Sequence, residues 1–259
     1  THSFDSISLI ISPALAAILF NIWDVSVIAL LDVAGAIIAI TIIFFIHVPK
    51  IEKIRNTENL HIFQDTKDSL AVIRKNKVLV AVFVVGTLYA FIYFPIGSMY
   101  PLITMTYFRG TVADSSVVEI MFSAGSLLGS VLLGIVGSRA QNVRTIAASI
   151  AIYGIGVTCT GLLPENGLHV FIVLSAIMGI TTPFFHGLRT AIIQAKVPEE
   201  YLGRVLSLVY SASMLSGPVG LVLGGRFSDL VGINYAFTVL GILTLCLAAV
   251  LLLTPSIRY

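Results

Sequence analysis

The feature that most constrains this chain is a series of eight apolar runs. Each is close to the roughly 20 residues that a helix needs to cross the hydrocarbon core of a bilayer. The runs cover residues 6–22, 25–48, 78–99, 116–136, 145–163, 168–191, 206–225 and 233–253. Only 11% of the 259 residues are charged, whereas a soluble domain carries roughly 25%. The sequence therefore predicts an all-α membrane protein with eight transmembrane helices.

The basic residues predict how these helices are oriented. Of the 15 Lys and Arg residues, thirteen fall on one side of the membrane in the eight-helix pattern, and only Arg109 and Arg226 fall on the other. Loops rich in Lys and Arg stay in the cytoplasm, so we expect both ends of the chain to be cytoplasmic. In this assignment Arg189 anchors the cytoplasmic end of the sixth run by extending its side chain to the interface.

A polar segment divides the runs into two groups. Residues 1–48 hold two runs, residues 49–77 form the polar segment, and residues 78–259 hold the other six. Within the segment Ile62, Phe63, Leu70 and Ile73 recur at helical spacing. This spacing predicts a short amphipathic helix on the cytoplasmic face, and the alternative is a solvated linker.

An internal repeat relates the first run to the seventh. At a constant offset of 205 residues, three positions of the first run correspond to three of the seventh, and Asp24 corresponds to Asp229 in the turn that follows each run. The three pairs are Ser8 with Ser213, Ser12 with Gly217, and Pro13 with Pro218. Small residues let helix backbones approach closely, and the proline bends the helix. The pairs are therefore a candidate conformational motif, with ordinary helix packing as the alternative. Because the second group has six runs, we expect four further helices of the same protein upstream.

Ionisable residues inside the runs are candidate functional groups, because burying a charge in a membrane is costly. Asp32 lies about 10 Å along its helix from the external end, at 1.5 Å per residue, and no Lys or Arg in a run is placed to neutralise it. We expect it to bind a cation or carry a proton, with a polar cap at the interface as the alternative. Glu119 is a second candidate nearer the external surface. His186 titrates near neutral pH when unperturbed, but a lone helical His is more often a packing residue.

The third run is rich in aromatic residues. Tyr89 and Tyr93 share one helix face and predict a wall that suits a bulky amphipathic ligand, with ordinary packing as the alternative. Tyr100 is expected outside the membrane, in an interfacial belt. Pro95 and Pro183 are expected to break their helices, as in helices that line a cavity.

Signatures of soluble enzymes are absent from the sequence. It contains no Walker A loop, no Gly-x-Ser-x-Gly, no His-Glu-x-x-His and no cysteine pair. Cys159 and Cys246 lie inside predicted spans without metal-ligand spacing. We therefore expect no enzyme activity, metal or cofactor. The net charge of +2 is explained by the cytoplasmic anchors, so nucleic acid is not an expected partner.

Several segments resemble the major facilitator superfamily, and within it the macrolide-efflux branch of its proton-driven drug exporters. The segments are 86–95, 161–167, 176–183, 197–207 and 224–229. The likeness runs along nearly the whole chain and corresponds to spans five to twelve of a twelve-span member. Two positions depart from the family: Ser12-Pro13 replaces a glycine-containing motif, and Ser138 stands where a loop motif has Asp.

The resemblance implies a secondary transporter of the bacterial inner membrane. It would export lipophilic drugs such as macrolides by proton antiport through alternating access, with Asp32 first and Glu119 second for charge recognition or coupling. The alternatives are export of a siderophore or another amphipathic metabolite, and a truncated scaffold that does not transport. An anionic substrate is not expected, because acids are the charges assigned to the membrane interior.

Overall fold

The computed structural model describes residues 25–45, 62–137 and 142–253, and the regular elements in these ranges are helices. Their bounds are α2 Val25–Phe45, α3 Ile62–Arg74, α4 Lys77–Ser98, α5 Tyr100–Leu102, the π-helix η1 Ile103–Tyr107, α6 Val112–Val136, α7 Val143–Leu162, α8 Leu168–Lys196, α9 Glu199–Val231 and α10 Ile233–Leu253. Six of them are long and apolar enough to cross a membrane: α4 together with its extension to Tyr107, and α6 to α10.

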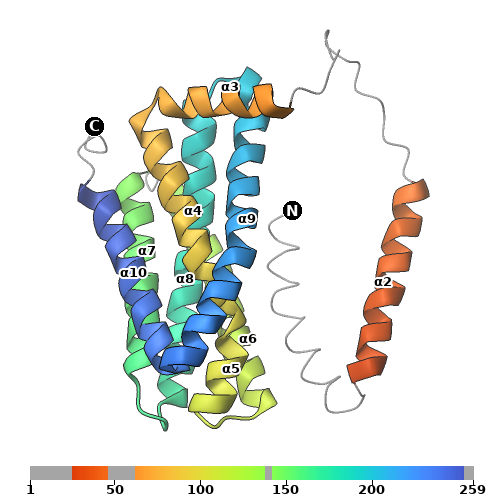
Figure 1. The fold of residues 1–259 in the computed structure, drawn as a ribbon, viewed down its shortest axis with the longest axis vertical. Helices are drawn as coiled ribbons and strands as arrows, with labels where there is room; N and C mark the ends of the chain where they lie inside the picture. The colour runs from red at the N-terminus through yellow and green to blue at the C-terminus, as the bar shows by residue number, and fades with distance from the viewer. Residues whose placement is uncertain (1–24, 46–61, 138–141, 254–259) are drawn as a thin grey trace.

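These six helices confirm the last six apolar runs. The second run forms α2, and the first run lies outside the described residues. The six helices form one bundle around a common core (Figure 1). Its largest fully buried side chains include Tyr153, Phe171 and Phe237, so aromatic residues from α7, α8 and α10 fill its centre.

Glycines bring the helices of the bundle together in pairs. A Cβ atom at Gly125 of α6 would overlap the carbonyl of Ala176 in α8, and one at Gly129 would overlap that of Ile180. In the pair α4–α9, a Cβ at Gly220 would overlap the Phe91 carbonyl. Backbones in contact at this distance gain dispersion energy that larger residues would prevent. Gly125 and Gly129 therefore mark a close contact between α6 and α8, and Gly220 marks one between α4 and α9.

The repeat motif is described only in its second copy. Gly217 packs against the ring of Phe94 in α4, whereas Pro218 is exposed and α9 continues through it. Ser8, Ser12 and Pro13 lie outside the described residues.

Within the polar segment the structure has a helix, α3, which includes the four apolar positions of the expected amphipathic helix. It lies across one end of the bundle and packs against α4 and α9 (Figure 1). Ser69 and Ile73 face the bundle and are buried. The chain then enters α4 through Asn76, whose side chain accepts a hydrogen bond from the Val78 N–H, which is the usual N-cap arrangement.

The end of α4 differs from what the sequence predicts. Tyr100 was expected outside the membrane, but helical structure continues to Tyr107 and only 4% of Tyr100 is exposed. Its ring packs against Phe122, Phe171 and Phe237. The expectation is wrong because the helix does not end at Met99, so Tyr100 stays level with the core.

Three further helix boundaries depart from expectation. α4 continues through Pro95 to Ser98, and α8 continues through Pro183, so neither proline breaks its helix. A proline removes only one backbone donor, and close packing of neighbouring helices keeps such helices intact. Asp229 lies in the last turn of α9 rather than in the following loop, because the helix ends only at Gly232 (φ 91°).

Candidate functional site

The site centres on Arg189, a charged residue in the interior of the bundle. The sequence assigns it to the cytoplasmic interface, but only 5% of Arg189 is exposed. This expectation is wrong because α8 continues two turns further, to Lys196. Arg189 therefore lies about 10 Å before the end of the helix, at 1.5 Å per residue, and its side chain turns into the bundle.

A glycine and a serine on neighbouring helices hold the Arg189 guanidinium. A Cβ at Gly86 of α4 would come within 2.5 Å of Cζ and Nε of Arg189, so the absence of a side chain there makes room for the guanidinium. Both terminal nitrogens, Nη1 and Nη2, donate to Oγ of Ser213 in α9 at 3.2 Å. Cζ also lies 5.8 Å from the ring centroid of Phe185, within the range of a cation–π contact.

The Arg189 charge has no carboxylate partner among the described residues. Its Nε is buried without any hydrogen-bond partner, and the ion pair found in the described ranges joins two other residues, Arg109 and Glu165, at an exposed position. The Ser213 hydroxyl donates its hydrogen bond to the Val209 carbonyl. Its neutral oxygen is therefore the acceptor for the guanidinium. A buried cation with only neutral partners is an expensive arrangement.

An aromatic cluster lies beside Arg189. The ring centroids of Tyr89 and Tyr93 are 5.5 Å apart, and both rings pack against Tyr153 of α7. Phe185 of α8 lies 4.2 Å from Tyr89, and His186 lies 6.2 Å from Tyr93. The structure thus brings three of the sequence-predicted residues together. Tyr89 is buried in the core, so Tyr93 and His186 are the members that reach the surface.

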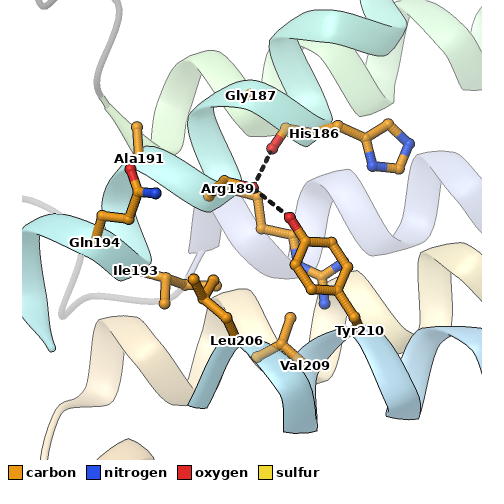
Figure 2. A pocket seen from close by; sticks show the side chains of 10 residues that line it. His186, Gly187, Arg189, Ala191, Ile193, Gln194, Leu206, Val209 and Tyr210 are labelled. Carbon is orange, nitrogen blue, oxygen red and sulfur yellow. Dashed lines mark hydrogen bonds between the residues drawn. The ribbon is translucent and has the colours of Figure 1, made fainter. Parts of the chain in front are cut away.

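A second hydrogen-bonded bridge joins α8 to α9 near Arg189. Thr190 Oγ1 donates to the His186 carbonyl and lies 3.2 Å from the Tyr210 hydroxyl. The Thr190 hydroxyl has one proton and donates it to the His186 carbonyl. In the bond between Thr190 and Tyr210 the donor is therefore the Tyr210 hydroxyl. Figure 2 shows Tyr210 reaching from α9 toward α8, whereas the His186 ring points away from it.

Between these two helices lies a cavity of about 430 Å³. Arg189, Thr190 and Tyr210 line it together with Gln194. Its apolar lining comes from Ile193, Leu206 and Val209. No Asp or Glu contributes to the described lining, so the formal charge of the cavity is positive.

Of the two candidate acids, Glu119 is not part of the aromatic cluster or of the cavity lining. Glu119 is half-buried on α6. Because Gly125 faces Ala176 and Gly129 faces Ile180, Glu119 is level with the first turn of α8, roughly 28 Å along the helix from Arg189. Asp32 lies in α2, and its side chain is outside the described set.

Comparison with known proteins identifies the family. The sequence model of the Major Facilitator Superfamily matches residues 82–258, which include nearly all of the six-helix bundle. This chain belongs to the major facilitator superfamily. It is accordingly a multi-pass membrane protein, and within the described residues six helices are long and apolar enough to span the membrane.

Relatives within the superfamily are drug exporters by name. The chain is 42% identical to Macrolide efflux protein A of Streptococcus pyogenes over 258 residues, which is 100% of this chain and 64% of that protein. It is 43% identical to Macrolide efflux protein A of Enterococcus faecalis over 221 residues, 85% of this chain and 68% of the relative. The Multidrug efflux pump Tap of Mycolicibacterium fortuitum is 26% identical over 150 residues, 58% of this chain and 36% of Tap. The chain thus spans just under two thirds of the length of the first of these relatives.

Sequence reasoning missed the central residue of the site in this superfamily member. Arg189 was assigned to the interface, and Gly86, Tyr153 and Tyr210 were not singled out. One signal was present in the sequence: the first charged residue after Arg189 is Lys196, and apolar residues lie between them, so Arg189 is two turns inside the helix.

Proposed function

We propose that this chain is part of a proton-driven exporter of macrolides in the bacterial inner membrane. The observation that carries the proposal is the 42% identity to Macrolide efflux protein A along the whole chain. Alternating access moves two six-helix halves against each other. In this scheme residues 78–259 form the second half, residues 49–77 connect the halves through α3, and residues 1–48 belong to the first half.

The packing of the bundle supports this scheme. α6 and α9 are the spans with the smallest buried share, 22% each, whereas α7 is 56% buried. In a half transporter, the least buried helices are those with free surface for the opposite half. Both ends of this chain would be cytoplasmic, as the distribution of basic residues predicts.

Asp32 and Glu119 remain the proposed groups for charge recognition or proton coupling. A macrolide carries an amine, and the carboxylate of Asp32 would pair with it in a membrane interior. Tyr93 and His186 would contribute an aromatic surface for the bulky body of the drug. These roles are proposals that rest on residue type and position.

Erythromycin accumulation in a drug-sensitive bacterium tests the proposal. Cells expressing the complete protein should accumulate less erythromycin than control cells, and a protonophore should restore the control level. The Asp32→Asn variant should lose export, whereas Asp229→Asn, a change of an exposed acid, should keep it. Unchanged accumulation with the protein shown in the membrane would remove the macrolide assignment. Full export by Asp32→Asn would remove only the role of Asp32.

A further inference from the structure

We infer that the cavity between α8 and α9 binds the anionic group of an amphipathic molecule, a carboxylate, sulfonate or phosphate held by Arg189. The site is a property of the described bundle and does not depend on macrolide export. It also reverses the expectation that an anion would be excluded, because that expectation treated acids as the charges of the membrane interior.

The first argument is the unbalanced charge of Arg189. Only 5% of Arg189 is exposed, its Nε has no hydrogen-bond partner among the described residues, and its terminal nitrogens share one serine oxygen. A guanidinium has five N–H donors that match the oxygens of a carboxylate or phosphate in a bidentate arrangement. Because Nε is buried out of reach of the cavity, an anion there would bond to the N–H groups of Nη1 and Nη2 that the described residues leave unused.

The second argument is that Glu119 is too distant to serve as the counter-ion of Arg189. Glu119 is roughly 28 Å from Arg189 along the bundle.

The third argument is the lining of the cavity. Gln194 adds a polar group capable of donating hydrogen bonds, and the lining formed by the described residues contains no Asp or Glu that would repel an anion. Ile193, Leu206 and Val209 form an apolar wall on the same cavity, which would accommodate a hydrocarbon or aromatic body. The ligand class is therefore an amphiphile with one negative head group, supplied either by a soluble compound or by a membrane lipid.

A matched pair of fluorescent probes tests this inference on the complete purified protein. The probes are 1-anilinonaphthalene-8-sulfonate, which is anionic, and N-phenyl-1-naphthylamine, its neutral counterpart without the sulfonate. The Arg189→Gln variant should bind the anionic probe about tenfold more weakly or worse, because it loses a charge-assisted hydrogen bond, and should bind the neutral probe unchanged. Arg189→Lys should fall between. Arg144→Gln, which changes an exposed arginine at the start of α7, should leave both affinities unchanged.

Equal binding of the anionic probe by Arg189→Gln and the unaltered protein would overturn the inference. Should Arg189→Gln fail to fold, Leu206→Trp keeps the cation and fills the cavity. It should cause a similar loss for the anionic probe, and unchanged binding there would overturn the inference as well.

Lipid nanodiscs separate the two sources of the anion. If phosphatidylglycerol, which is anionic, weakens binding of the anionic probe to the unaltered protein more than to Arg189→Gln, compared with zwitterionic phosphatidylcholine, the occupant is the head group of an anionic lipid. An equal effect on both proteins assigns the site to a soluble amphiphile.

Discussion

Two kinds of helix contact coexist in this bundle. Between α6 and α8 the backbones touch through Gly125 and Gly129, with no room for even a methyl group. Between α8 and α9 the contact consists of side-chain hydrogen bonds, from Arg189 to Ser213 and from Tyr210 to Thr190, beside a cavity of about 430 Å³.

The α6–α8 contact belongs to a part of the bundle that stays fixed, whereas the α8–α9 contact belongs to a part that can change. A glycine contact is made by the backbone and has no alternative arrangement, because packed interiors resist small changes of volume. Hydrogen bonds from long side chains can break and re-form with a ligand in between. Both kinds of contact lie within the same bundle, and the cavity lies where the contact is of the second kind.

The largest effect is expected at the glycine contact. In Gly125→Leu the new side chain would meet the Ala176 carbonyl, which cannot move without shifting α8. We expect a loss of at least about 3 kcal/mol, above the usual range for overpacking, seen as loss of folded protein after detergent extraction. Gly134→Leu is the matched control on the same helix, because no heavy atom lies within 4 Å of its Cβ position. If the two variants melt at the same temperature, the α6–α8 contact does not hold the bundle as described.

Much of this rigid part is visible in the sequence. The six apolar runs from residue 78 onward predict the six long helices, and Gly125-x-x-x-Gly129 and Gly220-x-x-x-Gly224 mark where two pairs approach. Hydrophobic length and small-residue spacing are local properties, so a single sequence carries them. Which helix each glycine faces is not local, and only the structure supplied it.

The next largest effect is expected at the Arg189 bridge. Ser213→Ala removes the acceptor for both terminal nitrogens of Arg189. It should lower stability by about 1–3 kcal/mol, because a buried charged donor loses its partner. The measurement is the melting temperature of the purified protein, compared with Ser211→Ala, which alters an exposed serine of the same helix. Equal melting temperatures would mean that Arg189 finds another acceptor, and the bridge would then not be the link between α8 and α9.

A smaller effect is expected from the other side of the same guanidinium. In Gly86→Ala the new Cβ would lie 2.5 Å from Cζ of Arg189, so the guanidinium must shift and weaken its bonds to Ser213. Alanine is the better helix former by about 1 kcal/mol, and we expect the clash to cancel this gain. Gly97→Ala on the same helix has open space at its Cβ position. It should therefore keep any gain in stability that comes from the better helix propensity of alanine. A clear stabilisation by Gly86→Ala would show that Arg189 is not held against α4.

The polar part of the site was harder to predict, for a physical reason. Tyr89 and Tyr93 share a helix face by spacing alone, and the structure places them together. Arg189 looks from its sequence position like an interfacial anchor, because long basic side chains near helix ends usually extend to water. Its burial depends on Gly86 and Ser213, which are 103 residues before it and 24 residues after it. Such a pocket is defined by tertiary packing and leaves no periodic signal in the chain.

The smallest effect is expected at the second bridge. Tyr210→Phe removes the hydroxyl that donates to Thr190, at a residue that is 51% exposed. A hydrogen bond open to solvent is worth about 0.5 kcal/mol or less of net stability, because water replaces the lost partner. The melting temperature should therefore change by less than in Ser213→Ala.

The anionic probe should be more sensitive to Tyr210→Phe than the melting temperature is, since the hydroxyl lines the cavity beside Arg189. A two- to threefold loss of affinity, about 0.4–0.65 kcal/mol, with an unchanged melting temperature would identify the α8–α9 junction as a ligand-facing contact. If Tyr210→Phe is instead as destabilised as Ser213→Ala, both bridges stabilise the fold. The α8–α9 junction would then be as fixed as the glycine contacts.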